Sequence, residues 1–191
     1  YAAQKTLATT LEALIARFRD RPLDFAPGEK FAYSNSGYVL LTAVIEKASG
    51  QSYPDFVDEA LFQPLGMTDS GYDHPAVILS RRASGYVPTE DGVANADYVD
   101  MSVPQGAGGL YSTTRDLLKW EQGLFGGKLL RPSSLTQLIT PGLNDYALGL
   151  FVKKDDGDTI ISHSGGIAGF NTYILGDSIE GEARDVGIVM A

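Results

Sequence analysis

The chain has 191 residues, of which 43% are hydrophobic, a composition that suits one globular domain with a sizeable core. Its 15 Lys and Arg against 24 Asp and Glu give a formal net charge of −9, and the basic residues are scattered, which disfavours nucleic acid or an anionic membrane surface as a partner. The absence of Cys excludes disulfides, thiolate nucleophiles and sulfur-ligated metals. No apolar run reaches the roughly 18 residues of a membrane span, so we expect no transmembrane segment.

The N-terminal part of the sequence predicts three helices. Apolar residues at helical spacing indicate an amphipathic helix over about 5–20. A second helix over 36–49 is apolar around most of its circumference, which predicts that it is buried, and Gly50 can end it in the left-handed conformation. Ser52 and Asp55 resemble a capping box and predict a third helix through about residue 62.

The middle of the chain is less regular. Residues 69–105 show little periodicity, apart from one expected short strand around 83–87. Gly106-Ala107-Gly108-Gly109 predicts a flexible turn, after which Thr113 and Asp116 fit a capping box for a helix to about residue 125. A further short helix is expected over 132–139.

The pattern changes to strands at the C-terminal end. Strands are predicted over 146–152, 159–163, 170–175 and 185–190, with a hairpin turn at Asp155-Asp156-Gly157-Asp158. Helices first and an antiparallel sheet last is an α+β pattern. We therefore expect a mainly helical region, 1–145, and an antiparallel sheet region, 146–191.

Both ends of the sequence are unusual for a complete domain. The first residue is Tyr1 and not Met, and residues 186–191 read as an apolar buried strand that stops abruptly. We expect this chain to be a piece of a longer protein.

The usual motifs for metals, phosphates and nucleophiles are not present. His74 and His163 are the only histidines, without HExxH or similar zinc spacing, and an EF-hand loop starting at Asp155 would place Gly166 where its Glu belongs. The turn at 106–109 lacks both GxGxxG and P-loop spacing, which favours a hinge or a close backbone crossing. No GxSxG segment occurs. We therefore expect no metal and no cofactor.

Two short segments could carry chemistry. Tyr33-Ser34-Asn35 precedes the second predicted helix, and His163-Ser164-Gly165-Gly166 follows a predicted strand. Each also has a purely structural interpretation, because Asn35 or Ser36 can cap the helix and the second segment can be a turn between strands.

The surroundings of these segments resemble the serine hydrolases related to class C β-lactamases, penicillin-binding D-Ala-D-Ala carboxypeptidases and esterases. Residues 27–41 resemble that superfamily's Tyr-x-Asn segment, and His163-Ser164-Gly165-Gly166 looks like its Lys-Thr-Gly box in a His-x-Gly variant. The similarity covers nearly the whole chain in the family's order. The other matching segments are Ser49-Gly50, 61–67, 106–110 and 112–116.

The resemblance implies acyl transfer through a serine ester, but the family's nucleophile motif is missing. That nucleophile lies in a Ser-x-x-Lys motif upstream of the Tyr-x-Asn segment. None of the seven lysines here has a serine three residues before it. We expect that the nucleophile helix lies on the N-terminal side, outside these residues.

The resemblance also implies roles for the retained residues. Tyr33 would be the base beside the missing Lys, with His163 as a polar or cationic neighbour, and Asn35 would orient a substrate carbonyl. The backbone N–H of Gly166 would be one oxyanion donor. Two further residues would bind substrate: Gly165, which lets the strand approach it, and Ser164, which would face its carboxylate or ester.

The sequence thus predicts part of a serine acyl hydrolase, inactive as this fragment, with an α+β fold similar to β-lactamases and transpeptidases. The alternative is a non-catalytic peptide- or cell-wall-binding module, or an interaction domain completed by another chain. The expected substrates are esters, β-lactams or D-amino-acid peptides, and His in place of Lys favours an esterase or peptidase. Family members are commonly periplasmic or at the cell surface. Because the family's sheet takes elements from both chain termini, we expect this piece to lack some neighbours of its sheet. Exposed sheet edges and a homodimer are then expected.

Overall fold

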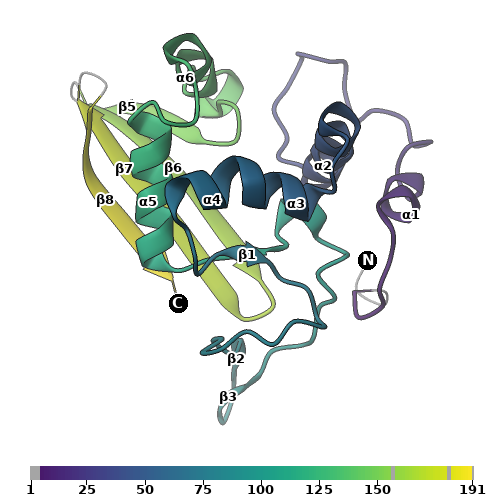
Figure 1. Cartoon of the computed structure of the whole chain (residues 1–191). Coiled ribbons are helices and arrows are strands. Elements are labelled where there is room, and N and C mark those ends of the chain that lie inside the picture. Colours follow the sequence, from purple (N-terminus) through teal and green to yellow (C-terminus); the bar gives the residue numbers. More distant parts are fainter. Residues whose placement is uncertain (1–4, 156–157, 180–181, 191) are drawn as a thin grey trace. The chain divides into compact units, whose positions relative to one another are not determined.

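The computed structural model describes residues 5–155, 158–179 and 182–190. Helices dominate the first part of the chain, and a four-stranded antiparallel sheet forms the last part (Figure 1). This confirms the predicted α+β class. The chain divides into two compact units: unit 1 contains residues 1–60, 70–111 and 166–170, and unit 2 contains the rest.

Unit 1 contains three α-helices and two short antiparallel strand pairs. The core residues Leu14, Val39 and Val103 pack together. The elements of this unit are α1 (Leu11–Ala16), α2 (Asn35–Ser49), α3 (Tyr53–Val57), β1 (Gly71–Tyr72), β2 (Tyr86–Thr89), β3 (Gly92–Asn95), the 3₁₀ helix η3 (Gln105–Ala107) and β4 (Leu110–Tyr111).

Helix α1 is shorter than the sequence predicts. It begins where Thr10 Oγ1 accepts a hydrogen bond from Ala13 N at 3.2 Å, and residues 17–20 continue only as turns. A stripe of apolar residues fixes which face packs, but it does not fix where backbone hydrogen bonding ends.

Helix α2 begins and ends close to the predicted positions, but it is not buried all round. Gly50 closes it with φ +74°, the expected left-handed C-cap. Leu40, Leu41 and Val44 are each roughly half exposed. The prediction of a buried helix is therefore wrong for this face, because in the described residues these side chains have no element covering them.

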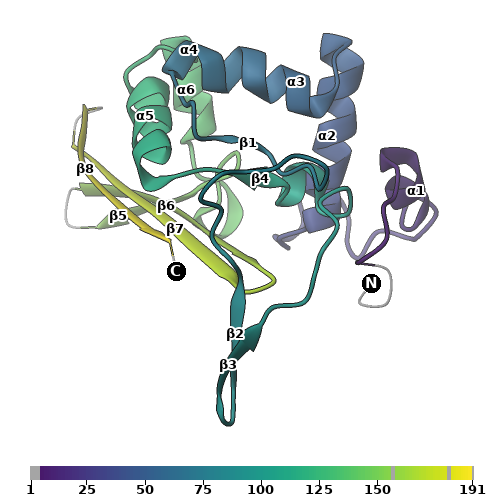
Figure 2. The ribbon, with the colours of Figure 1, turned by 60° about the horizontal axis from the view of Figure 1, so that its bottom comes forward.

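The poorly periodic middle of the chain forms two small antiparallel pairings. Strand β1 pairs with β4, and β2 pairs with β3 with Val87 opposite Ala94. The β2–β3 hairpin starts three residues later than the predicted strand, and Figure 2 shows it extending away from the rest of unit 1. Every residue of its two strands is exposed.

Unit 2 contains the main sheet and the helices that accompany it. Its elements are α4 (Gln63–Leu65), which follows the π-helix η2 (Asp58–Phe62), then α5 (Thr114–Phe125), α6 (Pro132–Leu138), the 3₁₀ helix η4 (Leu143–Asp145), β5 (Phe151–Asp155), β6 (Asp158–Ile167), β7 (Phe170–Ile179) and β8 (Glu182–Met190). The third predicted helix, to residue 62, is thus α3 continued by η2.

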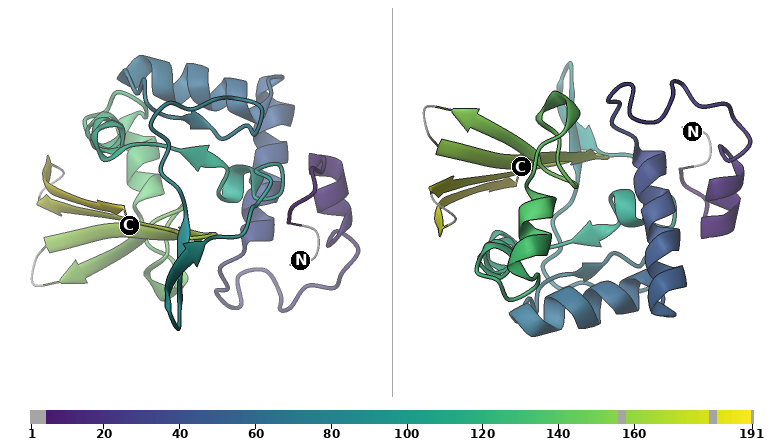
Figure 3. Two further views of the ribbon diagram at one scale, coloured as in Figure 1. Left: turned by 90° about the horizontal axis from the view of Figure 1, so that it is seen from below. Right: turned by 90° about the horizontal axis from the view of Figure 1, so that it is seen from above.

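The sheet has the order β5-β6-β7-β8, and its strands twist relative to one another (Figure 3). Asp155 pairs with Asp158 at the predicted hairpin, whose residues 156 and 157 lie outside the described residues. Tyr173 lies opposite Val189, which confirms a C-terminal strand. The sequence also predicts that residues 186–191 are buried, but their side chains lie outside what the structure describes.

The predicted strand over 146–152 forms only from Phe151 onward. Ala147 N donates to Leu150 O at 2.7 Å, and Gly149 adopts φ +94°, so residues 147–150 make a tight turn. Two residues of this turn, Ala147 and Leu150, pack with Val152 and Ile161 in the core of unit 2.

Helix α5 is fixed by the predicted cap and by a buried carboxylate. Thr113 Oγ1 accepts from Asp116 N at 3.2 Å. The Asp116 carboxylate accepts from Asp69 N at 2.8 Å and forms an ion pair with Lys119 at 2.7 Å. Asp116 therefore holds the segment before β1 against the start of α5.

Candidate active site

The Tyr33-Ser34-Asn35 segment lies at the N-terminus of α2. Ser34 is the N-cap, and its Oγ accepts a hydrogen bond from Gly37 N at 3.2 Å. The structural interpretation predicts the cap at Asn35 or Ser36, so the observed capping residue lies one or two positions earlier than predicted. Asn35 is the first residue of α2 and is exposed. Its amide can therefore meet a molecule in solution.

Tyr33 is partly exposed and stacks on α2. Its side chain is 45% exposed, and its ring centroid lies 5.7 Å from that of Tyr38 at an angle of 32°. Partial burial, and to a lesser extent the neighbouring Tyr38 phenol, raises the pKa of Tyr33 above its usual value of 10. In these surroundings the phenol holds its proton at neutral pH, so a base role requires a nearby cation.

His163 lies in β6 within an aromatic group. Its ring centroid is 6.1 Å from that of Tyr146 and 6.0 Å from that of Phe151, and these two aromatic rings are 4.8 Å apart. His163 Nδ1 lies 2.8 Å from the Ser164 carbonyl oxygen, and Nε2 lies 3.4 Å from the Tyr146 hydroxyl.

These contacts select a tautomer of His163. A carbonyl oxygen only accepts, so Nδ1 must carry the proton in this arrangement. Nε2 of the neutral ring is then the acceptor for the Tyr146 O–H, over a long hydrogen bond. The imidazole thus contacts the Ser164 carbonyl oxygen and the Tyr146 hydroxyl.

The three residues after His163 continue β6 to its end at Ile167. Ser164, Gly165 and Gly166 are all exposed. A Cβ at Gly165 would lie 2.5 Å from Thr172 Oγ1 on β7, so the glycine allows the two strands to pair closely there.

The six predicted site residues fall into both units. Tyr33, Asn35 and Gly166 belong to unit 1, whereas His163, Ser164 and Gly165 belong to unit 2. Each contact described above joins residues of the same unit, either unit 1 or unit 2. Their catalytic roles therefore stay predictions.

Tyr146 and Phe151 are neighbours of His163 that the sequence analysis did not single out. A signal for Phe151 exists, because a hairpin centred at residues 156–157 places Phe151 opposite Ser162, next to His163. Tyr146 reaches the same ring only because the chain turns back at residues 147–150, and Tyr146 forms an isolated bridge with Phe151.

Within the described residues, no group of three or more His, Asp and Glu side chains is arranged to hold a metal ion. Nor does any helix in that part of the chain have the length and apolar character needed to cross a membrane.

Comparison with known proteins finds relatives among penicillin-binding proteins and D-alanyl-D-alanine carboxypeptidases. Penicillin-binding protein 4* of Bacillus subtilis (strain 168) is 34% identical over 170 residues, covering 79% of this chain and 38% of that protein. D-alanyl-D-alanine-carboxypeptidase/endopeptidase AmpH of Escherichia coli (strain K12) is 31% identical over 173 residues, covering 80% and 43%. The chain thus spans less than half the length of these two relatives.

The fold agrees with these sequence matches. A crystal structure of a penicillin-binding protein from Bacillus halodurans superimposes with a TM-score of 0.81 at 28% identity, covering 95% of this chain and 57% of that chain. The protein-family model described as Beta-lactamase matches residues 1–191. This match over the whole sequence shows that the chain belongs to the beta-lactamase family.

Proposed function

We propose that the chain supplies the base, substrate-binding and oxyanion groups of a serine acyl hydrolase that works through an acyl-enzyme. The observation that carries this proposal is the exposed Tyr33 and Asn35 pair at the start of α2, in a chain that belongs to this family. A Ser-x-x-Lys motif outside the 191 residues would supply the nucleophile. We therefore expect the 191-residue chain alone to be inactive.

The proposed first step is attack of the serine Oγ on the substrate carbonyl carbon. The serine proton passes to Tyr33, whose phenolate the neighbouring Lys ammonium would stabilise against the effect of partial burial. Asn35 donates its amide to a substrate carbonyl, and the Gly166 N–H stabilises the developing oxyanion. Tyr33 then gives this proton to the leaving oxygen or nitrogen, so that an alcohol or amine departs as the acyl-enzyme forms. In the second step Tyr33 takes a proton from the attacking water and returns it to the serine Oγ as the ester is hydrolysed.

Esters and peptides of D-amino acids are the proposed substrate classes. The family's Lys-Thr-Gly box would place a permanent cation here for a substrate carboxylate, whereas this chain has the imidazole of His163 at that position. The similarity to a D-alanyl-D-alanine carboxypeptidase supports the peptide class. β-Lactam hydrolysis is the less favoured activity.

The regions 1–145 and 146–191 are proposed to form one catalytic domain, which the family match over both regions supports. We also propose that the 191-residue chain forms a homodimer. Its support is the exposed apolar surface of α2 and the half-exposed Tyr173 and Leu175 on β7.

A substrate panel on the full-length protein tests the function. We expect p-nitrophenyl esters or D-amino-acid peptides to give a higher kcat/KM than nitrocefin. Turnover of nitrocefin above both would overturn the substrate proposal. No turnover of any of the three, in a reading frame that begins near Tyr1, would support a binding module.

A further inference from the structure

The Gly106–Gly109 turn is a sequence motif to which the proposed mechanism gives no role. It includes the end of η3, immediately before β4, in unit 1. Its residues are not in the left-handed conformation that favours glycine, so backbone conformation does not explain the three glycines. What surrounds them gives a packing reason instead.

Thr42 of α2 is the direct neighbour of Gly106. The Thr42 side chain is 1% exposed, and its Oγ1 accepts a hydrogen bond from Gly106 N at 3.1 Å and donates one to Tyr38 O at 3.2 Å. A Cβ at Gly106 would overlap Thr42 Oγ1 and would lie 3.3 Å from the Tyr53 ring. Only glycine at position 106 lets the turn approach α2 closely enough for this hydrogen bond.

On one side, this contact leads to the Tyr-x-Asn segment. The carbonyl that Thr42 binds belongs to Tyr38, whose ring stacks with Tyr33. Thr42 lies two turns after Asn35 on the same helix. The hydroxyl therefore binds the N-terminal half of α2, which begins at Asn35 and whose Tyr38 ring contacts Tyr33.

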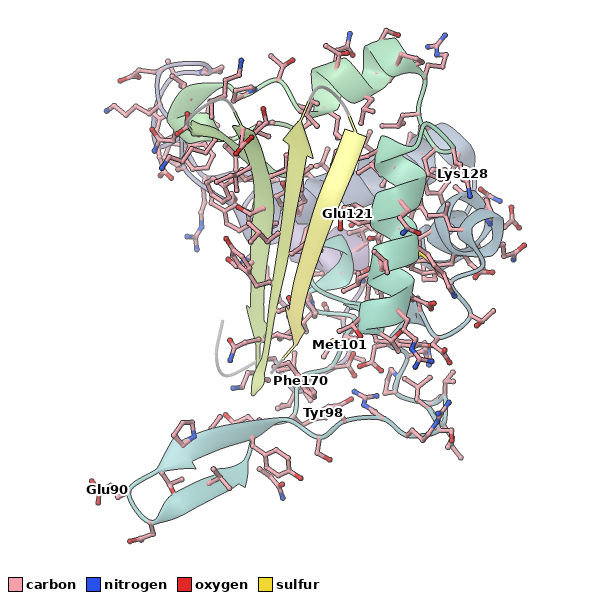
Figure 4. The ribbon with its side chains drawn as sticks, turned by 90° about the vertical axis from the view of Figure 1, so that its left-hand side faces the viewer. Glu90, Tyr98, Met101, Glu121, Lys128 and Phe170 are labelled. Atoms are coloured by element: carbon pink, nitrogen blue, oxygen red, sulfur yellow. The ribbon has the colours of Figure 1, made fainter. Side chains whose placement is uncertain are left out.

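On the other side, the turn reaches the segment that follows Gly166. The ideal Cβ position of Gly108 lies 4.0 Å from Ile167 Cδ1. Gly85, immediately before β2, lies close to the residues after Ile167, since a Cβ at Gly85 would lie 2.5 Å from Ala168 O and 2.8 Å from the Phe170 ring. In Figure 4, Phe170 lies next to the segment that leads into this hairpin.

We propose that Thr42 is a positioning residue, which sets Tyr33 and Asn35, at the start of α2, relative to the Gly166 N–H through the Gly106–Gly109 turn. The inference rests on the proposed function, since it concerns groups with roles in that reaction. Thr42 itself touches neither substrate nor the reacting atoms. Its hydroxyl acts by joining two segments that are far apart in the sequence.

Two substitutions at Thr42 separate the hydroxyl from the shape of the side chain. In the full-length protein, Thr42→Val keeps the shape but removes both hydrogen bonds, and Thr42→Ser keeps the hydroxyl. We expect Thr42→Val to lower kcat by about ten- to a hundredfold while KM changes less than about threefold, as for misplaced reacting groups. Thr42→Ser should recover most of the rate.

Ser49→Ala is the matched control on the same helix. Ser49 Oγ also donates to a carbonyl four residues earlier, Ile45 O, and accepts from a backbone N–H, Gln51 N, but it does not contact the Gly106–Gly109 turn. Its removal should leave kcat within about twofold. Melting temperatures of all variants ensure that the rates compare folded proteins.

A double substitution tests the contact itself. Gly106→Ala should lower kcat because its methyl group meets the Thr42 hydroxyl. In a Thr42→Ala background that hydroxyl is absent, so adding Gly106→Ala should cost little more. Fully additive losses would contradict the contact as the cause.

Hydrogen exchange gives a readout that does not depend on activity. Thr42→Val should speed amide exchange in peptides covering 33–38 and 166–170, whereas a peptide covering α5 should not change. Unchanged exchange at 166–170, or a kcat loss no larger than that of Ser49→Ala, would overturn the positioning role. If the wild-type protein forms no acyl-enzyme, the proposed function fails separately, and the exchange result still decides on Thr42.

Discussion

The Tyr33 phenol is the residue on which the proposed proton transfer depends. Its pKa is raised by partial burial and by Tyr38, which is the opposite of what a base at neutral pH needs. The proposed mechanism therefore requires the Lys of the nucleophile motif beside it. Without that cation the phenol is a proton donor in hydrogen bonds and not a base.

Tyr33→Phe tests this role in the full-length protein. Loss of the hydroxyl should lower the rate of acyl-enzyme formation by about 10²- to 10⁴-fold, the usual contribution of a general base. Because the Tyr33 side chain is about half exposed, the melting temperature of the Tyr33→Phe protein should differ little from that of the wild type. Stopped-flow acylation with a chromogenic ester measures the rate.

Tyr86→Phe serves as the control, since Tyr86 is an exposed tyrosine on the β2–β3 hairpin. Equal rates for Tyr33→Phe and Tyr86→Phe would remove Tyr33 from the mechanism.

At this scale, the sequence could identify the motif residues but not their partners. Tyr33 and Asn35 are contiguous with a helix start, so local pattern is sufficient to find them. The contact between Tyr146 and His163 depends on a turn at Gly149, and the Thr42–Gly106 hydrogen bond joins residues 64 positions apart. Such contacts follow from tertiary packing, which local periodicity does not encode.

Among the elements, α2 depends on its cap. Ser34 Oγ accepts from Gly37 N, one of the first N–H groups of the helix, which also donates to the Ser34 carbonyl oxygen at 3.0 Å. Ser34→Ala should therefore lower the free energy of unfolding by about 1 kcal/mol, as measured by urea denaturation.

Ser36→Ala is the comparison for the cap, because Ser36 is exposed in the first turn of the same helix and is not its N-cap. A loss for Ser36→Ala as large as for Ser34→Ala would contradict the assignment of the cap to Ser34.

Helix α5 carries a buried carboxylate that the sequence did not predict to face inward. Glu121 is 1% exposed, and neither carboxylate oxygen has a hydrogen-bond partner among the described residues. Figure 4 shows it on the side of α5 that faces the sheet, and a Cβ at Gly176 on β7 would run into its Oε1. Burial raises the pKa of Glu121 to about 7.

This pKa predicts a pH-dependent stability. Since the folded-state pKa lies above the ordinary value of 4.5, ionisation is less favourable in the folded state than in the unfolded state. The stabilising effect of the neutral form is complete below about pH 4.5 and is lost as the pH rises through about 7.

Glu121→Gln should remove that dependence and stabilise the protein by about 1–3 kcal/mol at pH 8, because a neutral amide is less costly to bury. Urea denaturation from pH 5 to pH 8 measures the difference between the two proteins. Glu12→Gln, at an exposed position on α1, is the control. Its free energy of unfolding should follow that of the wild type at every pH. A difference between Glu121→Gln and wild type that is constant with pH would contradict the raised pKa.

Element type was easier to predict than burial. Cap residues and glycines placed α2 and α5 within one residue at each end, because these signals are local. The exposure of Leu40, Leu41 and Val44 could not be predicted, since apolar periodicity shows which face can pack but not whether a partner covers it.

For the whole molecule, the exposed apolar side chains predict self-association of the 191-residue chain. Leu41 and Val44 on α2, with Tyr173 and Leu175 on β7, leave apolar area in water whose burial is favourable. Sedimentation equilibrium should show a dimer whose population rises with concentration. A chain that stays monomeric at high micromolar concentration would contradict this.

The α+β class could be predicted from element order, since a change from helical to alternating periodicity near residue 146 separates helices from sheet. The family assignment needed motifs spread along the chain, which agree with the match over residues 1–191. No pattern within these residues identifies the nucleophile, because none of the seven lysines of the chain follows a serine at Ser-x-x-Lys spacing.

Intact-mass and peptide mapping after treatment with a fluorescent penicillin or a β-lactone test the central claim most directly. The full-length protein should gain one acyl adduct on the serine of a Ser-x-x-Lys motif outside these 191 residues. The 191-residue chain, treated in the same way, should gain none. Stoichiometric labelling of the 191-residue chain at Ser34, Ser36 or Ser164 would contradict the account.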